Sequence, residues 1–269
     1  MLIEELQKKS KFVRSGILKS VKEANGGHVG GGLSVTDILV VLYYDHLKFR
    51  VDNPHWDQRD RFILSKGHCC LPLYHILADI GFFSSNWINT YCLPGGKLAG
   101  HVEHTVPGIE LTSGSLGHGP AVSVGMAYAA KRLLEDWHVY VVLGDGECNE
   151  GSIWESFMAA SQWGLSNVHF IIDYNKQESL DHIDKIMSLE PLADKCTSFG
   201  LETTEIDGHN LSDLSLYFSK IRQANKPTML IAHTIKGKGV SFMEGVYKWH
   251  HSKMDDDQYR IALKENNHA

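Results

Sequence analysis

Two polar side chains follow neighbouring apolar runs of the sequence, at the point where each run ends. Asp145 stands between two glycines directly after VYVVL, and Asn175 comes shortly after VHFIID. Their separation of 30 residues (175 − 145) suits one strand–helix–strand unit, which brings both side chains to the same edge of a parallel sheet. Mg²⁺ takes one or two such oxygen ligands together with phosphate oxygens and water. The pair therefore predicts a magnesium-assisted diphosphate site.

The glycines beside Asp145 fit the same interpretation. Gly144 and Gly146 allow the backbone to turn sharply and a ligand to come close. A helical pattern begins near residue 151, and the amino end of such a helix suits phosphate oxygens. Taken alone, an aspartate between glycines is also typical of a turn or a helix cap. Asn175 is the residue that favours the metal site.

Histidine is abundant, with 16 in 269 residues. Imidazole N–H groups in a partly dry pocket bind phosphate oxygens well, and imidazole exchanges protons near neutral pH. The histidines predicted to act in this way stand in glycine-rich or motif segments: His28, His68, His101 and His250. Four others stay open between a functional and a structural role: His104, His118, His209 and His251.

Alternating apolar runs and helical patterns must position these residues. Strands are predicted at 62–65, 139–143, 168–173, 201–206 and 228–233, and helices at 151–163, 190–199 and 211–224. This alternation predicts right-handed strand–helix–strand units, and hence an α/β fold with a mostly parallel sheet. The runs are continuously apolar, which predicts strands buried on both faces.

The remaining segments complete one predicted domain over residues 1–269. Helical patterns cover the first 25 residues, 71–83 and 117–134. Ser34 is predicted to cap a helix over 35–45, after a glycine-rich loop. The C-terminal tail is predicted to form a short peripheral helix, and no linker is visible.

Composition and charge argue against several classes of protein. The net charge of −6, with both signs interspersed, argues against a nucleic-acid binder. No apolar run approaches the roughly 20 residues that span a bilayer, and the amino terminus has no apolar signal core. Five cysteines without a paired motif are predicted to be reduced thiols. A cytoplasmic protein without membrane or nucleic-acid partners is expected.

Several motifs, taken together and in order, resemble the N-terminal, diphosphate-binding part of transketolase. GDG with the later asparagine is the thiamine diphosphate signature, and the resemblance runs from about residue 24 to residue 251. The matching segments are NGGHVGGGLSVTDIL, DRFILSKGH, AGHVEHTVPGIELTSGSLGHG, GDGECNEGSIWE, DYNK, IDGHN, TIKGKGVSFME and WHH. The resemblance implies the thiamine diphosphate-binding fold, with helices on both faces of the sheet.

The resemblance also implies how the cofactor is held. Mg²⁺, or Ca²⁺ or Mn²⁺ in its place, would be bound by the side chains of Asp145 and Asn175 and by the backbone carbonyl of Gln177. His68 and His250 are implied as diphosphate contacts. The full set of implied cofactor contacts is His68, Leu116, Gly117, Gly146, Glu155, Ile235 and His250.

Catalytic roles are implied for His28, His101 and Glu150. The two histidines would line the substrate channel near the reactive carbon of the cofactor. Glu150 and Glu155 would lie near an inter-subunit boundary and link paired active sites. An alternative for both acids is a first-turn carboxylate that complements the helix dipole.

One expected group has no match in the sequence. In the family, a glutamate on a second, pyrimidine-binding domain activates the cofactor, and no residue here corresponds to it. The resemblance therefore implies the N-terminal subunit of a split transketolase, active only with a separate C-terminal chain in an α2β2 assembly. Its reaction would transfer a two-carbon ketol unit from a ketose, or ketose phosphate, to an aldose.

Three other functions compete with this hypothesis. The chain could be the α subunit of a 2-oxo acid dehydrogenase, which shares the metal pair, although the AGHVEH and SKGH segments favour transketolase. It could instead be a cofactor-binding remnant without catalysis, although such a protein has no need for channel histidines. A nicotinamide-binding protein is excluded, because GxGxxG after a first strand is missing.

Overall fold

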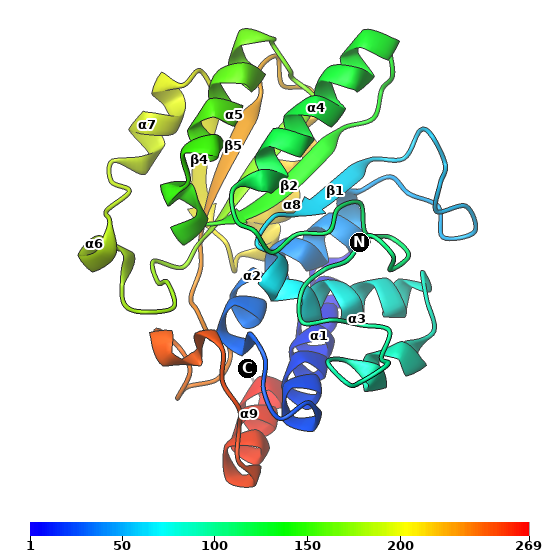
Figure 1. Ribbon diagram of the computed structural model, residues 1–269, viewed down its shortest axis with the longest axis vertical. Helices are drawn as coiled ribbons and strands as arrows, with labels where there is room; N and C mark the ends of the chain where they lie inside the picture. The colour runs from blue at the N-terminus through cyan, green and yellow to red at the C-terminus, as the bar shows by residue number, and fades with distance from the viewer. Residues whose placement is uncertain (269) are drawn as a thin grey trace.

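The computed structural model describes residues 1–268, so Ala269 of the predicted domain lies outside the described residues. Within them, one sheet of five parallel strands has the order β1-β2-β3-β5-β4 (Figure 1). The strands are β1 (Arg61–Leu64), β2 (Val139–Gly144), β3 (Val168–Tyr174), β4 (Glu202–Asp207) and β5 (Thr228–His233). Each matches a predicted run to within a residue or so. The predicted α/β class with a parallel sheet is confirmed.

Helices cover both faces of the sheet. Their bounds are α1 (Ile3–Glu23), α2 (Val29–Val41), α3 (Cys70–Ile80), α4 (His118–Leu133), α5 (Gly151–Gln162), α6 (Ile183–Ile186), α7 (Leu192–Ser198), α8 (Leu211–Ile221) and α9 (Asp256–His268). Short 3-10 turns matter for the site: η2 (Gly67–Cys69), η4 (Gly146–Asn149) and η5 (Tyr247–His250). Among the described residues, no helix combines the length and the apolar character needed to cross a bilayer.

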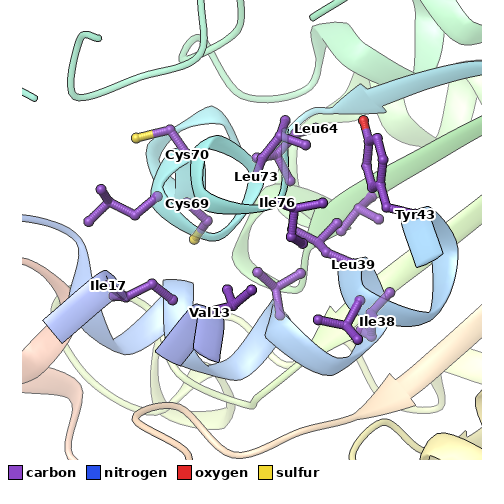
Figure 2. Close-up of a cluster of buried hydrophobic side chains, with 14 of the residues drawn as sticks. Val13, Ile17, Ile38, Leu39, Tyr43, Leu64, Cys69, Cys70, Leu73 and Ile76 are labelled. Carbon is purple, nitrogen blue, oxygen red and sulfur yellow. The ribbon is translucent and has the colours of Figure 1, made fainter. Parts of the chain in front are cut away.

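The alternation of side chains along β2 shows why every residue of this strand is buried. Val139, Val141 and Leu143 enter a cluster with α4, α5 and α7, whereas Tyr140 and Val142 enter a second cluster with α1, α2, α3 and α8. Figure 2 shows part of the second cluster, in which α1, α2 and α3 meet. A strand covered on both faces has no polar side, which explains the continuous apolar run.

Helix α2 begins six residues before the first residue of the predicted helix, which was residue 35. It starts at Val29 and runs through the glycines, so Ser34 is an interior residue rather than a cap. The glycines are needed for close packing: a Cβ at Gly31 would lie 2.6 Å from the Cys69 sulfur. Ser34 uses its hydroxyl to donate to Asp173, at 2.6 Å. The prediction of a loop and a cap here was wrong, because the glycines had a packing role.

Strand β4 and helix α9 also differ from expectation. β4 is an edge strand with exposed carboxylates at Glu202 and Glu205, so it is not buried on both faces. Helix α9 lies at one end of the molecule alongside α1 (Figure 1). It is firmly packed, since Ala262 is fully buried and the Asn266 amide donates to the Lys11 carbonyl at 2.9 Å. All five cysteines are free thiols.

Candidate functional site

The site lies beyond the carboxyl ends of β1, β2 and β3. Gly144 of β2 is in register with Asp173 of β3, which brings the next residues of both strands to one edge. Asp145 caps η4 through its Oδ1, which accepts from the Gly146 N–H at 2.8 Å. Its Oδ2 accepts from the backbone N–H of Lys176. Asp145 is therefore both a cap and a group that links β2 to the loop after β3.

A cavity of about 260 Å³ opens at this edge. Nine of the thirteen predicted site residues line it: His28, His68, His101, Leu116, Asp145, Gly146, Asn175, Gln177 and His250. They come from segments far apart in the sequence. The two end segments are joined directly, because Gly27 and Ser252 pair as an isolated antiparallel bridge beside His28 and His250.

The histidines form one cluster around His28. The centre of its ring lies 5.1 Å from that of His68, 5.5 Å from that of His101 and 5.4 Å from that of His250. Burial, then the neighbouring histidines and Lys236, lowers the pKa of His28 to about 3. Burial and Lys236 lower the pKa of His250 to about 4, and the pKa of His68 is also well below its usual value. These three rings are neutral at pH 7, so each can accept a hydrogen bond at one nitrogen and donate one at the other.

Two lysines in the cavity wall were not singled out from the sequence, although both lie inside quoted motifs. Lys66 of SKGH and Lys236 of TIKGKG are almost fully buried. The Lys66 ammonium lies 2.5 Å from the Asp173 carboxylate. Burial disfavours both charges, but their attraction outweighs it, so the pKa of Asp173 is lowered and that of Lys66 is raised. No signal in the sequence marked either lysine, because only the fold shows that both are buried.

Lys236 reaches the loop that follows Asn175. Its ammonium lies 3.0 Å from the Gln177 carbonyl oxygen, 2.9 Å from that of Glu178 and 3.1 Å from His250 Nδ1. Burial, with Lys66 nearby, lowers its pKa to about 8. The carbonyl predicted to bind a metal thus already accepts a hydrogen bond from Lys236, and only its second lone pair is available to a metal ion.

The other polar groups of the cavity suit a metal ion that is bound together with phosphate oxygens. Burial raises the pKa of Asp145 to about 6, with Lys66 opposing and Asp173 adding to the effect. A cation beside this carboxylate would offset the cost of its burial. The Gln177 Oε1 is buried without a hydrogen-bond partner. In the described part of the chain, no three His, Cys, Asp or Glu side chains form a metal cage. A magnesium ion here would need phosphate oxygens and water beside Asp145 and Asn175.

Four predicted residues lie outside this cavity. Glu150 is exposed at the start of α5, and Glu155 is exposed one turn further on. Gly117, at the start of α4, donates its N–H to the buried carboxylate of Glu147 at 2.9 Å. Ile235 is not among the lining residues, although its neighbour Lys236 is.

Glu147 is the buried acid of the GDGECNEG segment. Its carboxylate also accepts from the Ser65 hydroxyl and the Gly144 N–H. Burial raises its pKa despite these bonds. Sequence reasoning selected the later acids, because nothing in the pattern distinguished the buried glutamate from the exposed ones.

Comparison with known proteins gives the same assignment. The family profile described as "Transketolase, thiamine diphosphate binding domain" matches residues 7–267. One subunit of the apulose-4-phosphate transketolase of Phocaeicola vulgatus is 43% identical over 98% of this chain and 95% of its own length. The 6-deoxy-6-sulfo-D-fructose transketolase subunit SqwG of a Clostridium species is 38% identical over 97% of this chain and 96% of its own length.

Two solved structures match nearly all of this chain but less than half of their own length. Transketolase from Campylobacter jejuni superposes with a TM-score of 0.94 at 30% identity, over 99% of this chain and 43% of that one. A variant of Pichia stipitis transketolase gives 0.91 at 28% identity, over 96% and 40%. The chain spans about two fifths of the length of these solved transketolases.

Proposed function

This chain belongs to the transketolase family, and on that premise we propose that it is the N-terminal, thiamine diphosphate-binding subunit of a two-chain transketolase. Residues 1–269 would form one diphosphate-binding domain. One observation carries the proposal. The relatives whose names call them transketolase subunits match over 95% and 96% of their own length, whereas human transketolase matches over 42%. The chain therefore matches the named subunits over nearly their whole length.

The cavity fits the diphosphate end of the cofactor. Asp145 and Asn175 would hold Mg²⁺, or Ca²⁺ or Mn²⁺ in its place, with the second lone pair of the Gln177 carbonyl. Lys66 and Lys236 supply buried positive charge for the phosphate oxygens, and charge-assisted hydrogen bonds of this kind are strong. The N–H groups of His68 and His250 add neutral donors.

His28 and His101 are the groups proposed to move protons on the sugar. When bound, thiamine diphosphate supplies the carbanion that adds to a ketose carbonyl, and the protein orients it and handles protons around it. His28 is neutral at pH 7, so its free nitrogen can accept a hydrogen bond from a sugar hydroxyl. His101 stands beside it on the cavity wall. The reaction would transfer a two-carbon ketol unit from a ketose, or its phosphate, to an aldose.

An exposed helix face supports pairing of two copies of this chain within an α2β2 assembly. Ala121, Gly125 and Ala129 recur every four residues along the outer face of α4 and are exposed. A Cβ at Gly125 would meet no atom within 4 Å, so a second backbone could approach closely there. Apolar side chains extend the surface: Tyr128, Leu133, Leu134, Met158 and Trp163. Glu155 lies on the neighbouring helix, as a boundary role would require.

The alternatives explain less. The α subunit of a 2-oxo acid dehydrogenase would not account for relatives named as transketolase subunits. A non-catalytic remnant would not account for four histidines gathered in one cavity. The names of the two relatives above refer to different sugars. We therefore propose only that the substrates are small sugars or sugar phosphates. A cytoplasmic location, with no membrane or nucleic-acid partner, completes the proposal.

Co-purification tests the proposal. The tagged chain is isolated from its native cell extract, and the proteins that accompany it are identified by mass. We expect a stoichiometric second chain, and ketol transfer between a ketose phosphate and an aldose that requires both chains, thiamine diphosphate and Mg²⁺. Full ketol-transfer activity from the isolated chain, or 2-oxo acid decarboxylation by the pair, would overturn it.

A further inference from the structure

His209 lies in the loop between β4 and α8 and reaches across to two other parts of the fold. Its Nδ1 is 2.7 Å from the Asp37 carboxylate on α2. Its Nε2 is 2.9 Å from the backbone nitrogen of Ile235, in the segment that follows β5. The side chain is only 10% exposed. The imidazole therefore bridges α2 and the segment after β5, which are not neighbours in the sequence.

The two partners fix which nitrogen carries the proton. A carboxylate can only accept, so Nδ1 must donate to Asp37. The N–H of Ile235 can only donate, so Nε2 must accept and carry no proton. The contacts thus require a neutral imidazole in one defined tautomer, in the way that a carboxylate orients a histidine ligand.

Asp37 is held in place from the opposite side. The Arg14 guanidinium on α1 lies 2.5 Å from the same carboxylate, and both side chains are at least 90% buried. Burial opposes ionisation of Asp37, but Arg14 and the His209 hydrogen bond outweigh it, so its pKa lies well below the usual range. These contacts therefore rest on an ionised, buried carboxylate with partners on two sides.

The series of contacts from Arg14 through Asp37 and His209 ends at the segment Thr234–Lys236. The Thr234 hydroxyl donates to Asp173 below the cavity, and the Lys236 ammonium enters the cavity itself. Ile235, which lies between these two residues, donates its backbone N–H to His209 rather than to a strand. The position of the Lys236 backbone is thus set on one side by a hydrogen bond to an imidazole.

We propose that His209 is a positioning residue, which accepts the Ile235 N–H and so holds the segment Thr234–Lys236 with the Lys236 ammonium at the cavity. It touches neither cofactor nor substrate. The consequence for thiamine diphosphate binding rests on the function proposed above, whereas the consequence for the segment itself does not.

Two substitutions separate the two bonds of the imidazole. Asparagine places its amide N–H near the position of Nδ1, so His209→Asn can keep the bond to Asp37 but loses the acceptor for Ile235. Glutamine places its amide oxygen near the position of Nε2, so His209→Gln can keep that acceptor but loses the bond to Asp37. A control is His233→Asn, because the partly exposed His233 imidazole contacts Glu205 and not this segment.

Amide hydrogen exchange of the isolated chain is the first measurement. Exchange at Ile235 and at Gly237, whose N–H donates to the Gly30 carbonyl at 3.0 Å, should be about tenfold faster in His209→Asn, the size expected for one lost hydrogen bond. It should change less than about twofold in His209→Gln and in His233→Asn. Unchanged exchange at Gly237 in His209→Asn, or equal effects of Asn and Gln, would overturn the proposal.

The second measurement is thiamine diphosphate affinity of the two-chain assembly in saturating Mg²⁺. We expect a dissociation constant about tenfold higher in His209→Asn and near wild type in His209→Gln. Faster exchange with unchanged affinity would keep the positioning role and contradict the cofactor role of Lys236. Unchanged exchange would refute the positioning role whatever the affinity does.

Discussion

The ammonium of Lys66, in the wall of the cavity, lies 2.5 Å from the Asp173 carboxylate, and both side chains are buried. Asp173 also accepts hydrogen bonds from the Ser34 and Thr234 hydroxyls, so both of its oxygens are engaged inside the protein. The pair joins the end of β1 to the end of β3. It therefore sets the distance between the SKGH segment and the loop that carries Asn175.

Breaking this pair should be costly. Lys66→Met leaves the Asp173 carboxylate buried without its cation, which is expected to lower the free energy of unfolding by about 3–5 kcal/mol. Urea denaturation measures it. The control is Lys185→Met, which removes an exposed partner of Asp181 and should leave the unfolding curve unchanged. Equal curves for both variants would contradict the structural role of the pair.

Metal binding should depend on the charge of Asp145. Asp145→Asn keeps the size of the side chain but removes the charged ligand, so Mg²⁺-dependent binding of thiamine diphosphate should weaken by at least about tenfold. Calorimetric titration of the two-chain assembly at several Mg²⁺ concentrations is the measurement. Asp184→Asn, on helix α6, is the matched control. An unaltered Mg²⁺ dependence in Asp145→Asn would place the metal elsewhere.

Two adjacent glycines of α2 should respond in opposite ways to alanine. A Cβ at Gly31 would lie 2.6 Å from the Cys69 sulfur, so Gly31→Ala should destabilise by about 1–3 kcal/mol through overpacking. A Cβ at Gly32 would find its nearest atom at 3.5 Å, an ordinary contact. Gly32→Ala should therefore stabilise by up to about 1 kcal/mol through helix propensity. Thermal and urea unfolding compare the two, and a stabilised Gly31→Ala would show that the packing is looser than described.

Acid should weaken the fold through a second group of histidines, at the opposite ends of the strands. His138 Nδ1 lies 2.7 Å from His169 Nε2, and His46 lies 2.8 Å from the Tyr140 hydroxyl. Burial, with Arg222 adding to it, lowers the pKa of both His46 and His138 to about 4. Burial also lowers the pKa of His169 well below its usual value.

The sign of the pH effect follows from these pKa values. The unfolded chain, with histidine pKa values near 6.5, takes up protons before the folded protein does. The free energy of unfolding should therefore fall as pH drops from about 6.5 to about 4, by at most about 1.4 kcal/mol per pH unit for each such histidine. The buried histidines of the cavity act in the same direction.

One variant isolates this second group. His169→Asn cannot be protonated and keeps an amide near Thr228, the partner of His169 Nδ1, so its stability should depend less steeply on pH. Urea unfolding at pH 7, 6 and 5 gives the slope. The exposed His55 provides the control, as His55→Gln should retain the wild-type slope. A slope that is the same in His169→Asn as in wild type would exclude this group as the source.

The strands other than β4 were predictable because each is an apolar run that ends in a turn signal. Their order in the sheet was not, since β5 inserts between β3 and β4 and no local pattern records which strands pair. The start of α2 was missed because a run of glycines looks like a loop until the close approach of Cys69 is known. Local sequence thus predicted elements but not their packing.

Within the site, the histidines and the Asp145–Asn175 pair were found because their types and positions in motifs are unusual. Lys66 and Lys236 were overlooked because a lysine is ordinarily a surface residue, and only the fold shows that both are buried. His209 was left open for a related reason. Its role depends on Asp37 and Ile235, which lie 172 and 26 residues away in the sequence.

The bridge between Gly27 and Ser252 has a consequence for how the protein is made. His28 leaves the ribosome 222 residues before His250 (250 − 28). At a synthesis rate of roughly 5–20 residues per second, His250 is made about ten to forty seconds after His28. A nascent chain can build its sheet in that interval but has no complete pocket. Thiamine diphosphate can therefore stabilise the chain only after both walls of the pocket have been synthesised.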